Sequence, residues 1–489
     1  MNDFLLELEP KPVWKYFREI LAIPRPSKKE EKIIRYLLDF GKQHNLETLQ
    51  DEIGNVLIRK PASPGMENRP IVVLQSHVDM VCEKNSDVDF DFESDAIQAR
   101  IEGNWVKATG TTLGADDGIG IAAQLAILAD PELIHPPLEC LFTVDEETGL
   151  TGAFGLIPGF LKGKILLNLD SEDEGELFIG CAGGVDTVAS FDLETEPAPA
   201  GAAAFHLSVT GLLGGHSGDD ISKGRANANK LLNRILWSAS KEYGLRLAGI
   251  EGGNLRNAIA REAQAVVTVP AEHADGFKQF VSRMDQVMKQ EYRITEPDLK
   301  VSVHPAELPE KVITESLQKR LLHSLYACPH GVMAWSASIP NFVETSTNLA
   351  SVKIREKQIE VTTSQRSSVE SAKEDIKNMV ASVFLLAGAR VEHSDGYPGW
   401  TPNPDSEIVA LTASLYRELF NEEPKVLAIH AGLECGLIGA VYPGMDMISF
   451  GPTIKGAHSP DERLHIPSVE KFWKLTLEVL KNIPEEHTD

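Results

Sequence analysis

Residues 71–79 read IVVLQSHVD, a short apolar run that leads directly into His77 and Asp79. Three further runs of this kind occur at 138–144, 164–169 and 447–450. Runs this short and this apolar are typical of strands buried on both faces of a mainly parallel sheet. Helical patterns lie near them, for example at 118–128 and 469–483. The mixture predicts an α/β protein with helices on both faces of the sheet.

The middle of the chain has a different pattern. After the glycine-rich GCAGGV (180–185), alternating strands and long polar helices extend to about residue 394. We therefore predict an inserted α+β domain at 188–394, within a catalytic domain made of 1–187 and 395–489. A weak repeat inside the insertion predicts two similar subdomains, because NL, RE, Q and VT at 254–268 recur 94 positions later at 348–362. Convergent composition of two amphipathic strands is the alternative.

Length and charge narrow the classes of function. The chain has 489 residues, enough for two or three domains, and a formal net charge of −25. This charge repels phosphate backbones and anionic lipid, so we expect neither a nucleic-acid nor a membrane partner. The five cysteines are scattered without a C-x-x-C pair, and no apolar stretch approaches the ~18 residues of a membrane span. The first residues carry acids rather than the basic start of a secretory signal, so we expect a cytoplasmic protein.

Residue types that bind metals follow each of the four apolar runs. The carboxyl ends of parallel strands meet at one edge of a sheet, so these side chains are expected to converge. They are His77 and Asp79, Asp145 to Glu147, Asp170, and His458 in a glycine-rich loop, joined by Asp116 and Asp117 directly before a helix. Histidines and carboxylates without thiolates suit Zn²⁺, Co²⁺ or Mn²⁺. The number of carboxylates suggests two metal ions, one carboxylate bridging them.

Spacing suggests further roles within this set. His77 and Asp79 point the same way in an extended chain, so Asp79 can accept the free ring N–H of a metal-bound His77. Glu146 and Glu147 are adjacent, so at the end of a strand we expect them to point apart. One of them can therefore bind a metal while the other acts as a general base.

Together these motifs resemble the dinuclear zinc family that contains dipeptidases, carnosinases, carboxypeptidases and acylamino-acid deacylases. The resemblance covers essentially the whole chain, and LLGGHSGDDI (212–221), HAGLECG (430–436) and GAHSPDERL (456–464) bring it closest to the bacterial dipeptidases. It implies that His77 and Asp170 bind one metal, that Glu147 and His458 bind the other, and that Asp116 bridges them. It also implies that Glu146 is the general base, that Asp79 orients His77, and that the peptide bond between Asp116 and Asp117 is cis. The implied metals are two divalent ions, Zn²⁺ before Co²⁺ or Mn²⁺.

The same resemblance makes the insertion a lid that binds substrate. His216 would contact the developing oxyanion, with a cap on a glycine turn as its alternative role. Asn257 would contact the substrate, although Ala260 stands where proline is usual in the family. Arg366 would bind the substrate carboxylate, although it lies about two residues beyond the usual arginine. Backbone N–H groups at the start of the helix predicted after HAGLECG offer a second place for a carboxylate, and a purely structural turn is equally compatible.

The activity implied is hydrolysis of dipeptides, including Xaa-His, by a bridging hydroxide with Glu146 as the base. A deacylase or carboxypeptidase with the same metals, or a binding protein without activity on this fold, is the alternative. GADDGIG lacks the G-x-G-x-x-G order of dinucleotide-binding proteins, and the G-x-S-x-G of serine hydrolases is absent. The sequence leaves open whether the chain forms a homodimer.

Overall fold

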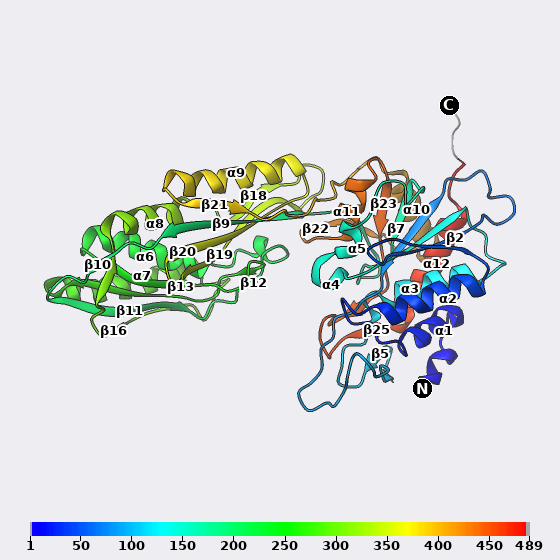
Figure 1. Cartoon of the computed structure of the whole chain (residues 1–489), viewed down its shortest axis with the longest axis horizontal. Coiled ribbons are helices and arrows are strands. Elements are labelled where there is room, and N and C mark those ends of the chain that lie inside the picture. Colours follow the sequence, from blue (N-terminus) through cyan, green and yellow to red (C-terminus); the bar gives the residue numbers. More distant parts are fainter. Residues whose placement is uncertain (1, 486–489) are drawn as a thin grey trace. The chain divides into compact units, whose positions relative to one another are not determined.

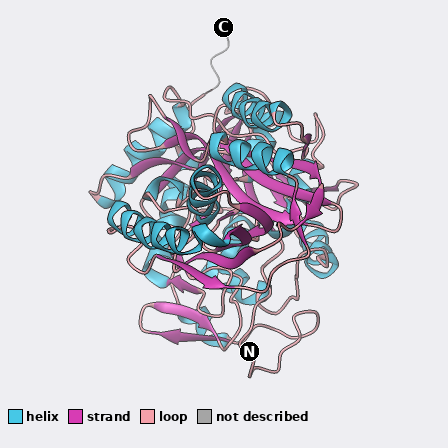
Figure 2. Ribbon diagram, turned by 90° about the vertical axis from the view of Figure 1, so that its left-hand side faces the viewer, coloured by secondary structure: helices cyan, strands magenta, loops and turns pink. Residues whose placement is uncertain are grey.

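The computed structural model describes residues 2–485, which form two compact units. The first unit consists of Met1–Gly180, Pro402–Ala428 and Leu433–Asp489, and the second of Cys181–Thr401 and Ile429–Gly432. In Figure 1 the second unit carries the green and yellow part of the chain. Helices and strands recur through the chain (Figure 2), as predicted for an α/β protein. Among the described residues, no helix is both long and apolar enough to span a membrane.

An eight-stranded sheet with the order β1-β2-β6-β3-β7-β23-β8-β22 forms the centre of the first unit. Its strands are β1 (Glu47–Gln50), β2 (Val56–Lys60), β3 (Val72–His77), β6 (Leu138–Thr143), β7 (Ile165–Asn168), β8 (Glu176–Cys181), β22 (Lys425–Ile429) and β23 (Asp446–Ser449). The four predicted runs became β3, β6, β7 and β23, which are parallel neighbours. Every residue of β3 and β6 is buried, because helices cover both faces of the sheet.

Helices accompany the sheet of the first unit, and its long helices are amphipathic or almost wholly buried. They are η1 (Asp3–Glu7), α1 (Lys11–Ile20), α2 (Glu31–Gln43), α3 (Ala115–Ala129), α4 (Glu146–Gly149), α5 (Thr151–Phe154), α10 (Glu407–Phe420), α11 (Glu434–Val441) and α12 (Ile466–Lys481). Nearly all of α3 is buried, and it packs against α1 and β3. A small antiparallel sheet in the order β24-β25-β5-β4 completes the unit, with β24 (Ile454–Lys455), β25 (Arg463–His465), β5 (Trp105–Ala108) and β4 (Ala99–Glu102).

A nine-stranded antiparallel sheet forms the second unit, in the order β16-β11-β15-β13-β19-β20-β9-β21 with β18 paired to β19. These strands are β9 (Gly183–Asp192), β11 (Ala202–Thr210), β13 (Arg246–Gly252), β15 (Ala263–Pro270), β16 (Lys300–Pro305), β18 (Gly331–Trp335), β19 (Val343–Ile354), β20 (Gln358–Ser367) and β21 (Arg390–His393). Burial alternates along β9 and β11, so one face of this sheet is covered and the other is open.

Four helices share the core of the second unit with the covered face of its sheet. They are α6 (Ala228–Glu242), α7 (Ala274–Glu291), α8 (Glu315–Ala327) and α9 (Glu370–Leu386). The short elements are β10 (Thr195–Pro197), β12 (Gly215–His216), η2 (Ile221–Lys223), β14 (Ala258–Ile259), η3 (Ala271–His273) and β17 (Lys311–Ile313). Isolated β-bridges pair Cys181 with Trp400 and Gly184 with Tyr397. Backbone pairing in this unit therefore extends beyond both ends of the insertion that the sequence predicted at 188–394.

The second unit has an internal symmetry of topology. Its two halves are β11-α6-β13-β15-α7-β16 and β9-α8-β19-β20-α9-β21, and they meet where β13 pairs with β19. The first half is inserted in the second, between β9 and α8. Asn254 and Asn348 do not occupy equivalent places, because Asn254 lies in the loop after β13, whereas Asn348 lies within β19. The duplication of subdomains therefore stays a prediction.

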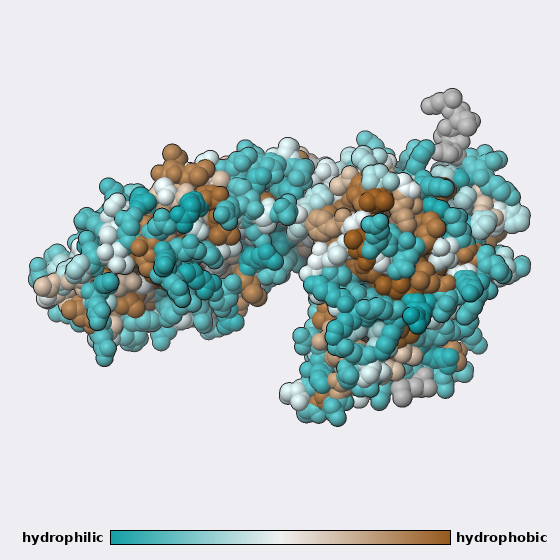
Figure 3. Space-filling model, viewed as in Figure 1, coloured by the Kyte–Doolittle hydropathy of each residue, from teal (hydrophilic) through white to brown (hydrophobic). Residues whose placement is uncertain are grey.

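Polar and charged side chains dominate the face drawn in Figure 3, as the net charge of −25 would suggest. Apolar side chains occur there in small groups. Leu385 and Leu386 at the end of α9 are among the exposed apolar residues of the described chain. Such scattered apolar residues are usual on protein surfaces.

Candidate metal centre

The carboxyl ends of three neighbouring parallel strands carry the residues that the sequence singled out. His77 is the last residue of β3, and Asp170 lies two residues after β7. After β6, Asp145 has a left-handed backbone (φ 49°) and leads into α4, whose first residues are Glu146 and Glu147. The sheet thus brings these side chains to one edge by the parallel registers of its strands.

Asp116 lies between two histidines that come from distant parts of the chain. Its Oδ1 is 3.0 Å from Nε2 of His77, and its Oδ2 is 3.2 Å from Nε2 of His458. Nε2 of His77 is also 3.4 Å from Oδ1 of Asp170, and Nε2 of His458 is 3.0 Å from Oε2 of Glu147. The result is two adjoining groups of three ligand types, which share Asp116.

The donor atoms of these two groups fit divalent cations. Each group offers one imidazole nitrogen and carboxylate oxygens within 4.8 Å of one another. Oε1 of Glu147 is buried without a hydrogen-bond partner. A mixed nitrogen and oxygen set is suited to Zn²⁺, Co²⁺ or Mn²⁺, and a shared carboxylate suits two ions.

The electrostatics of the edge also favour a cation. Burial and the negative charge of Asp116 raise the pKa of Asp170, although His77 opposes this shift. Hydrogen bonds to Asp116 and Glu147 raise the pKa of His458 to about 11. So many buried carboxylates are unfavourable together when ionised, and protons or metal ions must balance them.

Asp79 connects the histidine to the turn after β6. It is completely buried, and its Oδ1 lies 3.3 Å from Nδ1 of His77. Its two oxygens also accept hydrogen bonds from the backbone N–H groups of Glu146 (3.0 Å) and Glu147 (3.2 Å). Burial opposes ionisation of Asp79, but hydrogen bonding to His77 and Ser27 outweighs it and lowers the pKa of Asp79 to about 2. These contacts favour the ionised form of Asp79, which can hold both the ring of His77 and α4.

Glu146 belongs to the same edge. One of its oxygens lies within 4.8 Å of ligand atoms of His77 and Glu147. Burial raises the pKa of Glu146, and the charges of Asp170, Glu434 and Glu147 raise it further, while His77 lowers it. A carboxylate whose affinity for a proton is increased in this way is suited to general-base chemistry.

The loop that carries Asp116 is held by two residues that the sequence analysis missed. Glu462 is buried and accepts hydrogen bonds from the backbone N–H groups of Leu113 (2.6 Å), Gly114 (2.9 Å), Ala115 (2.7 Å) and Asp116 (3.3 Å). Its position four residues after His458, in GAHSPDERL, was the available signal.

Arg25 is the second of these residues. It is 2% exposed and donates to the backbone carbonyls of Val78 (3.0 Å), Asp79 (2.5 Å) and Gly114. Nothing in its local sequence indicated this role, because every acceptor is a backbone atom more than 50 positions away. The Asp116–Asp117 peptide bond in the same loop is cis, as predicted.

His216 and Asn257 come together within the second unit. β12, which ends at His216, pairs with β14, which begins directly after Asn257. The backbone N–H of Ser217 donates to the carbonyl of Asn257 at 2.8 Å. Nδ1 of His216 lies 3.2 Å from Oδ2 of Asp219. This short pairing places both predicted residues on adjoining loops.

Arg366 is near the same loops. It is 7% exposed on β20, and Nη1 donates to the hydroxyl of Tyr397 at 2.8 Å, whereas Nε has no hydrogen-bond partner. Its charge helps His216 to lower the pKa of Asp219. The ring of Tyr397 also packs against Gly432. A Cβ at residue 432 would lie 2.9 Å from a ring carbon of Tyr397, so a larger residue there would displace the ring. A buried guanidinium without a carboxylate partner is suited to binding an anion.

The helix expected after HAGLECG begins earlier than predicted. α11 starts at Glu434, inside the motif, rather than at 437. Gly432 belongs to the second unit and Glu434 to the first, so the chain returns from the second unit to the first within this motif.

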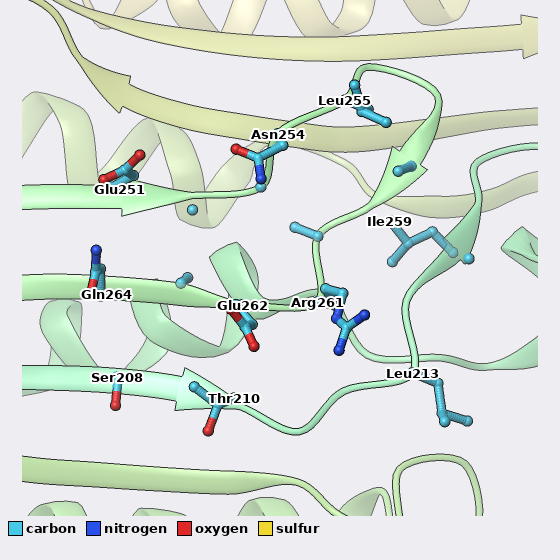
Figure 4. Close-up of a pocket in the computed structure, with 16 residues that line it drawn as sticks. Ser208, Thr210, Leu213, Glu251, Asn254, Leu255, Ile259, Arg261, Glu262 and Gln264 are labelled. Atoms are coloured by element: carbon cyan, nitrogen blue, oxygen red, sulfur yellow. The ribbon is translucent and has the colours of Figure 1, made fainter. Parts of the chain in front are cut away.

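A separate pocket of about 800 Å³ lies in the second unit (Figure 4). Side chains of β11, β13, β15 and their connections line it, among them Thr210, Glu251, Arg261 and Gln264. His216, Asn257 and Arg366 are not among its lining residues, although Gly215 and Ala258 are.

Known proteins resemble the chain over its whole length. The cytosol non-specific dipeptidase of Escherichia coli (strain K12) is 45% identical over 480 residues, 98% of this chain and 99% of that protein. The crystal structure of an aminoacylhistidine dipeptidase from Vibrio alginolyticus has a TM-score of 0.94 and 46% identity, and covers 100% of both chains. An aminopeptidase PepT from Bacillus cereus shares the fold, with a TM-score of 0.57, 14% identity and coverage of 97% and 99%. The model of peptidase family M20/M25/M40 matches residues 73–482. This chain belongs to peptidase family M20/M25/M40.

Proposed function

We propose that this protein is a metal-dependent dipeptidase that hydrolyses dipeptides, including Xaa-His. The single observation that carries the proposal is the position of Asp116, whose two carboxylate oxygens each face a different histidine at 3.0 and 3.2 Å. The names of the relatives from E. coli and V. alginolyticus, at 45% and 46% identity over nearly the whole chain, support the substrate class. The first of these names also supports a cytoplasmic location.

In this proposal two divalent cations, Zn²⁺ before Co²⁺ or Mn²⁺, are held by the two groups that share Asp116. His77 and Asp170 would complete one site, and Glu147 and His458 the other. When bound, the cations supply polarisation of the peptide carbonyl and activation of water. Asp79 would keep the ring of His77 in a fixed orientation through the contact at Nδ1.

Glu146 would act as the general base and then as the general acid. Its carboxylate accepts a proton from the attacking water and passes this proton to the amine that leaves when the peptide bond breaks. The turn that begins α4 holds Glu146 in place, because its backbone N–H donates to Asp79. Burial raises the pKa of Glu146, which suits both accepting and returning the proton.

The second unit would provide the contacts for the rest of the dipeptide. We propose that the region 188–394, with two repeated subdomains, is the substrate-binding lid of the enzyme. Arg366 would bind the substrate α-carboxylate with its unpartnered guanidinium edge. His216 would stabilise the oxyanion of the tetrahedral intermediate, and Asn257 would contact the substrate from the adjoining loop.

A kinetic panel tests the proposal. The protein is stripped with a chelator, reloaded with Zn²⁺, Co²⁺ or Mn²⁺, and assayed with Xaa-His dipeptides, other dipeptides, tripeptides and N-acyl amino acids. We expect hydrolysis of dipeptides that depends on the metal and is lost with the chelator. Faster turnover of N-acyl amino acids or tripeptides would make it a deacylase or a carboxypeptidase. Metal binding without any hydrolysis would make it a binding protein.

A further inference from the structure

A buried glutamate outside both metal groups adjoins the candidate metal centre. Glu434 is the first residue of α11, and its side chain is 1% exposed. Its Oε2 accepts hydrogen bonds from Nε2 of Gln75 at 2.5 Å and from the hydroxyl of Thr143 at 2.8 Å. Its Oε1 is buried and has no hydrogen-bond partner.

The two donors stand at the strand ends that carry the metal centre. Gln75 lies on β3 two residues before His77, so both side chains leave the same face of the strand. Thr143 is the last residue of β6 and precedes the turn at Asp145 by two residues. Glu434 thus accepts hydrogen bonds from both strand ends.

A chain of hydrogen bonds extends this contact across the sheet. The hydroxyl of Ser449 on β23 donates to Asn168 on β7, and Asn168 donates from Nδ2 to Oε1 of Gln75 at 2.6 Å. Gln75 in turn donates to Glu434. Every donor in the chain points toward Glu434, and hydrogen bonds to a carboxylate are about twice as strong as neutral ones. The carboxylate therefore orders four polar side chains beneath the metal-binding edge.

Packing alone does not account for a glutamate here. A buried carboxylate with an unpartnered oxygen is costly, and an apolar residue would fill the same space without that cost. A function that uses the carboxylate explains why it stands at this position.

We propose that Glu434 is a positioning residue of the metal centre, which acts through Gln75 and Thr143 to hold the ends of β3 and β6 where His77 and α4 must stand. The inference rests on the proposed function, because it assigns Glu434 to the same metal site. Glu434 itself is not proposed to bind a metal or to exchange a proton with substrate.

Two variants of Glu434 test this role. Glu434→Met removes the acceptor, and Glu434→Gln keeps one acceptor oxygen without the charge. We expect Glu434→Met to lower the affinity of the chelator-stripped protein for Zn²⁺, and kcat for a dipeptide, each by about 10- to 100-fold. Glu434→Gln should recover part of both losses. Zn²⁺ affinity is measured by competition with a chelating dye, so that it does not depend on turnover.

Glu139 provides the matched control. Like Glu434, it is a buried glutamate, but it lies on β6 at the end of the strand opposite Thr143. Its carboxylate accepts hydrogen bonds from Nε of Arg59 at 2.9 Å and from the backbone N–H of Lys162 at 2.7 Å. Glu139→Gln should lower stability in urea but leave Zn²⁺ affinity and kcat within about twofold of the wild type. If Zn²⁺ affinity falls in proportion to the loss of stability in the Glu139 variant as well as in the Glu434 variants, the proposal is overturned.

A double-mutant cycle tests the path through Gln75. Combining Gln75→Leu with Glu434→Met should lower Zn²⁺ affinity by less than the product of the two single effects, because both changes break the same contact. Independent effects, or Glu434 variants that bind Zn²⁺ and turn over like the wild type, would overturn the proposal. Wild-type protein that binds Zn²⁺ but hydrolyses no dipeptide would instead refute the proposed function, while the affinities would still decide on Glu434.

Discussion

The carboxylate of Glu462 accepts a hydrogen bond from the backbone N–H of Asp116, although 346 positions separate the two residues. The same carboxylate accepts from three preceding N–H groups, so it holds the whole loop that carries Asp116, the residue shared by the two candidate metal groups. Because Glu462 follows His458 by four residues, this contact also ties the loop of one histidine to the aspartate that it faces.

Replacing Glu462 with glutamine should therefore destabilise the loop of Asp116. One oxygen and a donor NH₂ would face four N–H groups, so about two charge-assisted hydrogen bonds are lost, and we expect a loss of about 2 to 4 kcal/mol in the free energy of unfolding. Urea denaturation of the metal-free protein measures this loss, and metal analysis should show weaker retention of both ions. Unchanged stability and metal content would show that the loop holds its shape without Glu462.

The two adjacent glutamates should respond differently to the same substitution. Glu146→Gln removes the proposed base, so both metals should remain while kcat falls by about 10² to 10⁴-fold. Glu147→Gln removes a proposed ligand, and one metal per chain should be depleted. Metal analysis beside steady-state kinetics distinguishes the two variants. Metal loss from Glu146→Gln, or normal turnover by it, would contradict its role as the base.

Metal binding should release protons and tighten as the pH rises. In the metal-free protein, hydrogen bonds to Asp116 and Glu147 raise the pKa of His458 to about 11, so this imidazole is protonated at neutral pH. A cation can bind Nε2 only after that proton leaves, and the affinity should rise by up to about tenfold per pH unit for each proton released. Calorimetric titration with Zn²⁺ in buffers of different ionisation enthalpy counts the protons. Affinity that does not change with pH between 6 and 8 would exclude His458 as a ligand.

Arg366 should affect substrate affinity more than turnover. If its guanidinium binds the dipeptide carboxylate, Arg366→Lys loses the paired geometry, and KM should rise about 10- to 100-fold with a smaller change in kcat. A dipeptide amide, which lacks the carboxylate, should be hydrolysed equally by variant and wild type. Arg390→Lys is the control, because Arg390 is exposed in the same sheet and pairs with Asp192 at 2.9 Å. An equal loss on the amide would reject carboxylate binding by Arg366.

Many strands of the first unit could be predicted from local patterns of apolar residues in the sequence. The four apolar runs predicted β3, β6, β7 and β23, because a strand buried on both faces must be apolar along its whole length. The residues that follow them could be predicted to converge, because parallel strands end at the same edge. Asp116 and His458 were candidates from their places before a helix and in a glycine-rich loop, but their roles as bridge and ligand came from the family resemblance.

The sequence by itself determined the α/β class, the family and the side chains that could meet at the sheet edge, because periodicity and motifs are properties of neighbouring residues. It did not indicate that Arg25, Glu434 and Glu462 contact the strand ends and the loop that carry these side chains. Their partners are backbone groups or side chains far away in the sequence, and a buried arginine or glutamate has no pattern of its own in the chain. It also did not show that the loops of His216 and Asn257 pair, because that contact depends on how the second unit folds. Only the tertiary structure decides such contacts, since it alone determines which polar groups are buried together and must satisfy one another.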